Sequence, residues 1–124
     1  MSWLAVGAGA ALGAWLRWRL GILLGGLHAY VQLGTLAANL VGGYLVGLAL
    51  AFFTTHPGIA LEWRLFAITG FLGGLTTFSS FSGESVLLLQ RGELGWALLH
   101  TALHLFGSLL CCAAGFATWR VLRG

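Results

Sequence analysis

The sequence predicts an all-α membrane protein in which one domain, residues 1–124, consists of four transmembrane helices. Hydrophobic residues make up 59% of the chain and charged residues only 7%, whereas about 25% charged residues are usual in soluble domains. So few charged side chains cannot cover a soluble surface, and the length suits four spans joined by short connections. We expect spans at residues 3–24, 33–53, 62–90 and 94–119, with the third broken near residues 73–77.

The first span combines small residues with arginine. Gly9 and Gly13 lie four residues apart, a spacing that allows another helix to approach closely. Arg17 lies in the last third of the span beside tryptophans, as expected of an arginine that extends to the membrane interface. The apolar run has no basic region before it and exceeds the length of a signal peptide, so we expect a retained span.

The second and fourth spans each carry a polar stripe. Thr35 and Asn39 share one face of the second span, where a buried asparagine is costly without a partner. Asn39 either bonds a neighbouring helix or faces an ion path. The stripe on the fourth span consists of small and polar residues at three- and four-residue spacing: His100, Thr101, His104, Ser108, Cys111, Cys112 and Gly115. We read the adjacent cysteines as small packing residues, because their spacing fits neither a disulfide nor zinc.

The third span is poorly suited to a continuous helix. Glycines at 70, 73 and 74 loosen its backbone, and hydroxyl side chains from 76 to 82 compete for backbone hydrogen bonds. Thirty residues of helix would also measure about 45 Å, well beyond a hydrocarbon core of about 30 Å. A broken helix at membrane depth must be buried in protein or line a polar cavity. Since such breaks commonly bind ions, we expect an ion site here.

The arginines are divided equally between the two ends of the predicted bundle. The chain has six arginines and no lysine. One end carries Arg64, Arg120 and Arg123, and the other carries Arg17, Arg19 and Arg91. This balance gives no preferred orientation under the positive-inside rule. Since the chain has no internal repeat, we expect symmetry from a second, oppositely oriented copy, an antiparallel homodimer. No basic cluster indicates nucleic acid.

Three sequence blocks resemble the Fluc fluoride channels, also called CrcB-like proteins. They are GAALGAWLR at residues 9–17, GTLAANLVGG at 34–43 and GFLGGLTTFSSF at 70–81. The resemblance covers all four predicted helices, most weakly the fourth. It implies a dual-topology homodimer that lets fluoride leave the cell passively through the bacterial cytoplasmic (inner) membrane. It also implies that Phe78 and Phe81 form an aromatic box faced by Asn39, and that backbone carbonyls of Gly73 and Thr76 hold a structural sodium ion at the dimer centre.

A fluoride path needs weak donors in series, because a strong positive charge would trap the ion. Amide and hydroxyl donors and the positive edges of phenylalanine rings meet this need. The candidates for the path are Asn39, Thr77, Phe78, Ser79, Ser80, Phe81 and Ser108. Packing remains the alternative role for the two phenylalanines, since i,i+3 spacing is ordinary in a core. Arg17, Glu84 and His104 are candidates for a vestibule.

The two histidines of the fourth span depart from the pattern of the resemblance, which has tyrosine and a small hydroxyl residue in place of His100 and His104. They are either a neutral pair bonded to a facing helix, or His104 lies in a wet vestibule and protonates in mild acid. Two other classes compete with a fluoride channel: a small multidrug-resistance-type proton-coupled transporter and a non-transporting structural subunit. The first span lacks the carboxylate that the former requires. None of these readings implies an enzyme.

Overall fold

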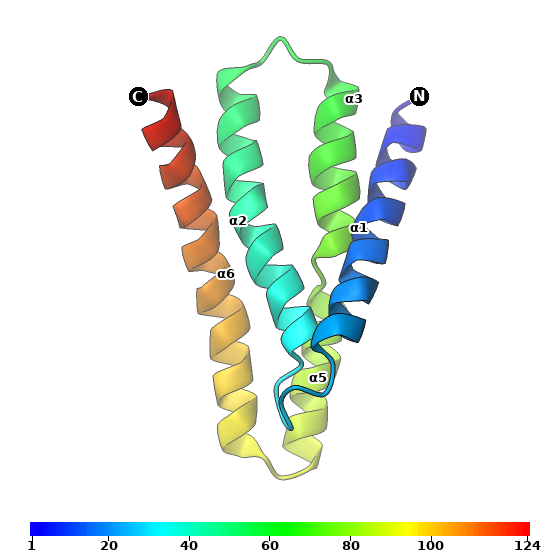
Figure 1. Cartoon of the computed structure of the whole chain (residues 1–124), viewed down its shortest axis with the longest axis vertical. Helices are drawn as coiled ribbons and strands as arrows, with labels where there is room; N and C mark the ends of the chain where they lie inside the picture. Colours follow the sequence, from blue (N-terminus) through cyan, green and yellow to red (C-terminus); the bar gives the residue numbers. More distant parts are fainter.

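A computed structural model describes all 124 residues, and the chain is helical apart from short connections. The long helices are α1 (Ser2–Leu24), α2 (Leu33–Thr55) and α6 (Leu94–Arg123). The third predicted span consists of α3 (Leu61–Arg64), η1 (Leu65–Leu72), α4 (Gly73–Leu75) and α5 (Phe78–Gln90). Both termini and the connection between α2 and α3 lie at one end of the molecule, and the other two connections lie at the opposite end (Figure 1).

Length and composition identify three helices that can cross a membrane: Leu33–Thr55, Leu61–Gln90 and Leu94–Arg123. The chain is therefore a multi-pass membrane protein by its helices. The α1 helix has 23 residues, the same length as α2, but two arginines near its end make it less apolar. Helix length and composition thus support three of the four expected membrane spans. That α1 also crosses the membrane stays a prediction.

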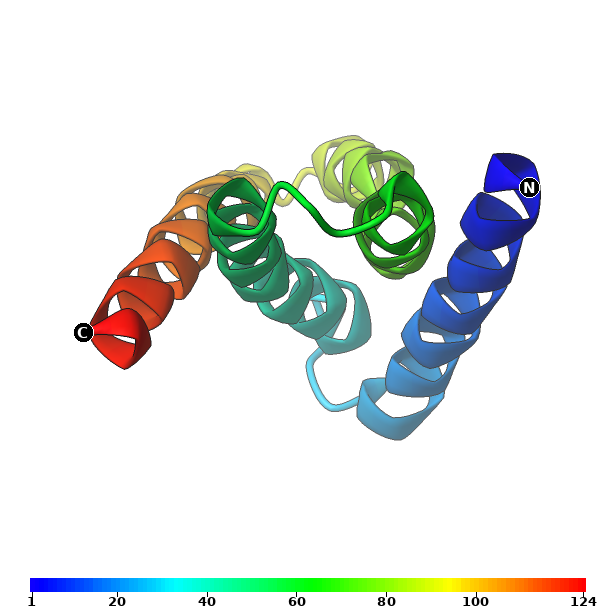
Figure 2. The same cartoon turned by 90° about the horizontal axis from the view of Figure 1, so that it is seen from above.

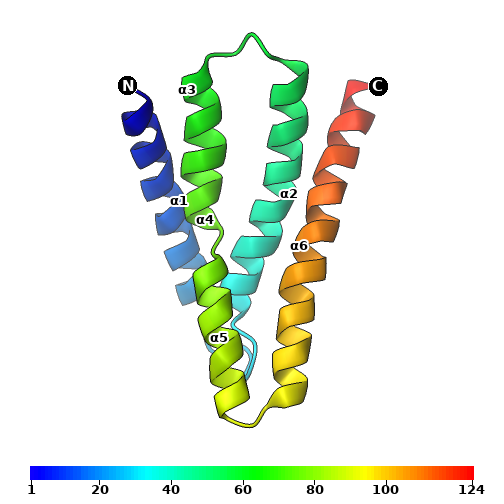
Figure 3. The ribbon, with the colours of Figure 1, turned by 180° about the vertical axis from the view of Figure 1, so that it is seen from behind.

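The helices form two packed pairs. Seen from the end, α1 and α6 lie on opposite sides, with α2 and the third span between them (Figure 2). The α1 helix packs along η1 and α4, and α2 packs along α6. The α5 helix then lies beside the first half of α6 (Figure 3).

Glycines permit the first of these contacts. A side-chain carbon on Gly9 would collide with the carbonyl oxygen of Phe66, and one on Gly13 would collide with that of Phe71. The predicted small-residue pattern of the first span is therefore a close backbone contact. The η1 segment that it meets is a wider π-helix of eight residues, a form that the sequence analysis did not predict.

Candidate functional site

The third span is interrupted at Thr76 and Thr77, within the predicted range. Both residues have extended backbone, with φ/ψ of −87°/156° and −151°/123°. Thr77 is the N-cap of α5, and its hydroxyl accepts the backbone N–H of Ser80 at 3.1 Å. In a continuous helix that N–H would donate to the carbonyl of Thr76. The break therefore frees this carbonyl oxygen.

The side chain of Asn39 on α2 forms hydrogen bonds with both backbone groups of Thr77 at the break. Its Oδ1 accepts the N–H of Thr77 at 2.8 Å, and its Nδ2 donates to the carbonyl of Thr77 at 3.0 Å. A continuous helix would have used the same N–H for the carbonyl of Gly73, so that oxygen also loses its helical partner. The side chain of a mid-span asparagine thus substitutes for the hydrogen bonds that the break removes.

Arg17 contacts the same break from α1. Its Nε donates to the carbonyl oxygen of Gly74 at 3.1 Å, and the side chain is half-buried. This contact pairs an arginine with an orphan carbonyl at the C-terminal end of a short helix, where a cation is favourable. Arg17 therefore has a structural contact at the break.

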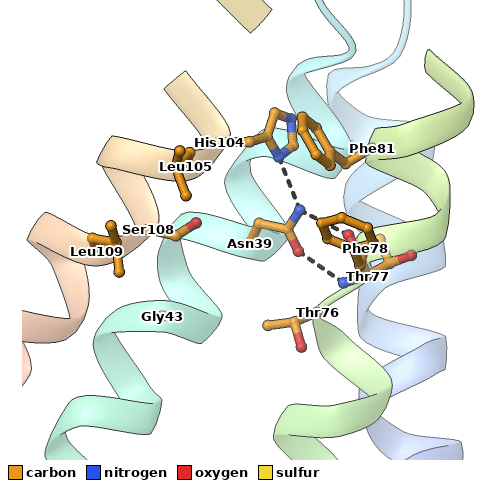
Figure 4. A pocket seen from close by; sticks show the side chains of 10 residues that line it. All are labelled: Asn39, Gly43, Thr76, Thr77, Phe78, Phe81, His104, Leu105, Ser108 and Leu109. Atoms are coloured by element: carbon orange, nitrogen blue, oxygen red, sulfur yellow. Dashed lines mark hydrogen bonds between the residues drawn. The ribbon is translucent and has the colours of Figure 1, made fainter. Parts of the chain in front are cut away.

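A cavity of about 340 Å³ lies beside the break, between α2, α5 and α6 (Figure 4). Its wall contains hydroxyl, amide, imidazole and aromatic groups but no arginine and no carboxylate. The lining residues are Asn39, Gly43, Thr76, Thr77, Phe78, Phe81, His104, Leu105, Ser108 and Leu109. The cavity can therefore offer hydrogen bonds to a small ion without a formal positive charge from arginine.

The two phenylalanines lie edge to face across the start of α5. Their ring centroids are 5.5 Å apart with an interplanar angle of 61°, the arrangement that aromatic rings prefer. Phe78 is 79% exposed on the single chain, whereas Phe81 is half-buried and packs against both histidines of α6. One ring thus lies at the surface of the chain and the other lies inside.

A buried polar cluster continues from Phe81 away from the break. Glu84 on α5 accepts the hydroxyl of Thr35 at 2.6 Å and lies 3.1 Å from Nε2 of His100. The other ring nitrogen of His100 is 2.9 Å from the hydroxyl of Ser85. His100 is fully buried. The carboxylate therefore joins α2, α5 and α6 through two hydrogen bonds.

The structure brings most of the predicted path residues into one wall. Asn39, Thr77, Phe78, Phe81 and Ser108 all line the cavity, whereas Ser79 and Ser80 do not. Of the three vestibule candidates, His104 lies in the cavity wall, Arg17 at the break and Glu84 in the buried cluster. Of the two proposed carbonyl ligands, Thr76 lines the cavity and Gly73 does not.

Sequence reasoning missed the partners that hold the site. Thr35 shares one face of α2 with Asn39, and this i,i+4 spacing is the signal that both side chains face the break and α5. Ser85 lies next to Glu84 in a polar run but gave no signal of its own. Leu105, Leu109 and Gly43 line the cavity as ordinary apolar or small residues, which no local pattern distinguishes from core packing.

Comparison with known proteins identifies the family of this chain. The profile of a family described as "CrcB-like protein, Camphor Resistance (CrcB)" matches residues 4–116. A "Fluoride-specific ion channel FluC" of Cupriavidus pinatubonensis is 60% identical over 122 residues, covering 98% of this chain and 97% of that protein. One of Pseudomonas putida is 58% identical over 123 residues, covering 99% and 97% of the two chains. By both measures, this chain belongs to the CrcB-like family.

Proposed function

We propose that this protein is a fluoride-specific ion channel through which fluoride leaves the cell passively. The observation that carries the proposal is the cavity at the break of the third span, whose wall supplies neutral donors and aromatic rings. Neutral donors can replace part of the hydration shell of fluoride without binding it too strongly for release. The chain is similar over nearly its full length to proteins named as fluoride-specific channels, and a channel of this kind is not an enzyme.

Each group in the wall has a part in this proposal. The hydroxyls of Thr77 and Ser108 donate hydrogen bonds, and the rings of Phe78 and Phe81 turn their positive edges to the anion. The α5 helix begins at the cavity, so the positive end of its dipole adds a favourable partial charge for an anion. Ser79 and Ser80 serve at the entrance to this segment. The conducting groups thus come from the start of α5 and from the facing side of α6.

We propose that the working unit is an antiparallel homodimer in the bacterial inner membrane. Phe78 is exposed on one chain although it belongs to the cavity wall, so a second copy would complete that wall. Both termini lie at one end of the molecule (Figure 1). Arg64 ends α3, and Arg120 and Arg123 lie in the last turn of α6, toward that end. Arg19 near the end of α1 and Arg91 just after α5 lie toward the other end. When Arg17 is counted with Arg19 and Arg91, each end has three arginines, so neither end has an excess of positive charge. In this arrangement α1 crosses the membrane as the fourth span.

A structural sodium ion fits the freed backbone of the break. The carbonyl oxygens of Gly73 and Thr76 have lost their helical donors to Asn39 and Thr77, and carbonyl oxygens suit a hard cation. One chain offers two such oxygens, and a second copy would offer two more. The ion would compensate these oxygens at the centre of the dimer and take no part in the passage of fluoride.

Fluoride efflux from liposomes tests the proposed function. Liposomes that contain the purified protein should release fluoride rapidly and retain chloride. The variants Phe78→Ile, Phe81→Ile and Asn39→Ala should each reduce fluoride flux strongly. Phe106→Ile is the matched control, because Phe106 is exposed on α6 and does not line the cavity. No fluoride release by the intact protein would refute the proposal, and full flux in all variants would return these residues to packing roles.

Orientation is tested separately with a reporter fused to the C-terminus. Comparable signals on both sides of the membrane are expected, and two arginines added to the connection between α2 and α3 should bias insertion and reduce flux. A single orientation of the unmodified protein would refute the antiparallel dimer while leaving the channel activity open to the efflux test.

A further inference from the structure

His104 is the one cavity residue with an unused buried polar atom. The residue is 4% exposed, and its Nε2 contacts neither solvent nor any hydrogen-bond partner. Its other ring nitrogen, Nδ1, lies 2.9 Å from Nδ2 of Asn39. Figure 4 shows Nδ1 directed to Asn39 and Nε2 on the side of Phe81. A buried polar atom without a partner costs free energy, and the protonation of Nε2 determines whether it can donate or accept a hydrogen bond.

The hydrogen bonds of Asn39 determine which nitrogen of His104 carries the proton. The backbone N–H of Thr77 is a donor, so the Asn39 atom that it contacts must be the oxygen. The NH₂ end therefore faces the Thr77 carbonyl and His104 Nδ1. A donor facing Nδ1 requires the lone pair there, so the hydrogen of the neutral imidazole lies on Nε2. The unpartnered atom is a hydrogen-bond donor.

The same reasoning excludes a metal ion at the nearby cluster. Glu84, His100 and His104 each offer a ligand atom within 4.8 Å of the others, which is close enough to suggest one. A metal needs a lone pair on each nitrogen. In His104, the lone pair of Nδ1 accepts a hydrogen bond from Asn39, and Nε2 carries a hydrogen. His100 Nε2 donates to the Glu84 carboxylate while Ser85 donates to its Nδ1. The N–H of His100 is already used by Glu84, so the free group of this cluster is the N–H of His104, which suits a hydrogen-bond acceptor.

We propose that the Nε2–H of His104 donates a hydrogen bond to fluoride during its passage, and that Asn39 is the positioning residue that holds the imidazole in this tautomer. The proposal rests on the proposed function. Fluoride is a strong acceptor, and a neutral N–H binds it without a full charge that would retain it. The ring of Phe81 packs against the imidazole, with its centroid 4.8 Å from that of His104, and its displacement would admit the anion to the buried donor.

The test reads the imidazole directly. Intact protein labelled with ¹⁵N-histidine is reconstituted in lipid nanodiscs at neutral pH, and the His104 signals are assigned by their loss in His104→Gln. Nε2 should carry the hydrogen and Nδ1 should not. Adding sodium fluoride should shift the Nε2–H signal, whereas sodium chloride at the same concentration should not. Fluoride flux should fall at least about tenfold in His104→Ala, as expected for loss of a hydrogen bond to an ion.

Controls separate this role from a structural one. His104→Gln can still donate an N–H and should retain much of the flux that His104→Ala loses. His56→Ala should conduct normally, because His56 lies in the connection after α2. A hydrogen on Nδ1, an Nε2 signal unmoved by fluoride, or a shift and block caused by zinc would each overturn the inference while the intact protein still conducts. Failure of the intact protein to conduct would instead overturn the proposed function.

Discussion

The two halves of α6 carry the same kind of sequence pattern and use it differently. In the second half, small residues face α2 and the two backbones nearly touch. A side-chain carbon on Gly47 would collide with the carbonyl oxygen of Cys112, and one on Gly115 would collide with that of Tyr44. In the first half, His100 and His104 instead meet α5 and α2 through aromatic rings and hydrogen bonds.

The difference depends on the residues across from α6. Opposite its second half, α2 presents glycine, so the helices approach until backbone meets backbone and no space remains. Opposite its first half, α2 presents Asn39 and α5 presents Phe81, which keep the helices apart and leave a polar cavity. Regular three- and four-residue spacing thus identifies the contact face, while the size of the facing residues determines whether that face packs or forms a site.

The largest effect should come from filling the close contact. Gly47→Leu places a side chain where the Cys112 carbonyl lies, so α2 and α6 must separate. We expect the free energy of unfolding to fall by about 3 kcal/mol, the upper end of the usual cost of overpacking, measured by denaturant unfolding of the purified protein in detergent.

The matched control is Gly95→Leu, a change at a helical glycine with open space around it. Its effect should stay below about 1 kcal/mol, the scale of helix propensity. Equal losses in the two variants would mean that the second half of α6 is no more tightly packed than its exposed first turn.

A smaller effect should follow from loosening the polar half. Thr35→Val keeps the shape of the side chain but leaves one oxygen of Glu84 without its donor. A hydrogen bond to a charged group contributes about 1.5–3 kcal/mol, so we expect a loss near the lower value in the same unfolding measurement, together with reduced fluoride flux.

Thr54→Val is the control for this substitution. Thr54 bonds only the carbonyl of Leu50 in its own helix and is exposed, so stability and flux should be nearly unchanged. Wild-type fluoride flux in Thr35→Val would show that the hydrogen bond from Thr35 to Glu84 is not needed for the passage of fluoride.

The sequence predicts the positions of the break and of its neighbours better than their connections. Competing hydroxyls and glycines correctly place the interruption, because these are local backbone effects. The adjacency of Phe78 and Phe81 is confirmed for the same reason, since i,i+3 spacing fixes neighbours on one helix. Local patterns also indicate that Asn39 requires a partner.

The partners themselves depend on how helices are shifted along one another, which no single segment records. The contact from Arg17 to Gly74 joins residues 57 positions apart, and arginine near a span end has an equally ordinary role at the interface. The hydrogen bond from Thr35 to Glu84 likewise joins α2 to α5. Each contact depends on where a neighbouring helix lies, so each appears only when the whole bundle is assembled.

The smallest effect should come from removing a hydrogen bond in the packed half. Tyr44 donates its hydroxyl to Thr118 at 2.8 Å, and Thr118 in turn donates to the carbonyl of Ala114. Tyr44→Phe removes only the first bond and leaves no charge unpaired, so stability should fall by about 0.5–1 kcal/mol. Fluoride flux per folded channel should not change, because neither residue lines the cavity. A loss of flux as large as that of Thr35→Val would mean that the second half of α6 also shapes the ion path.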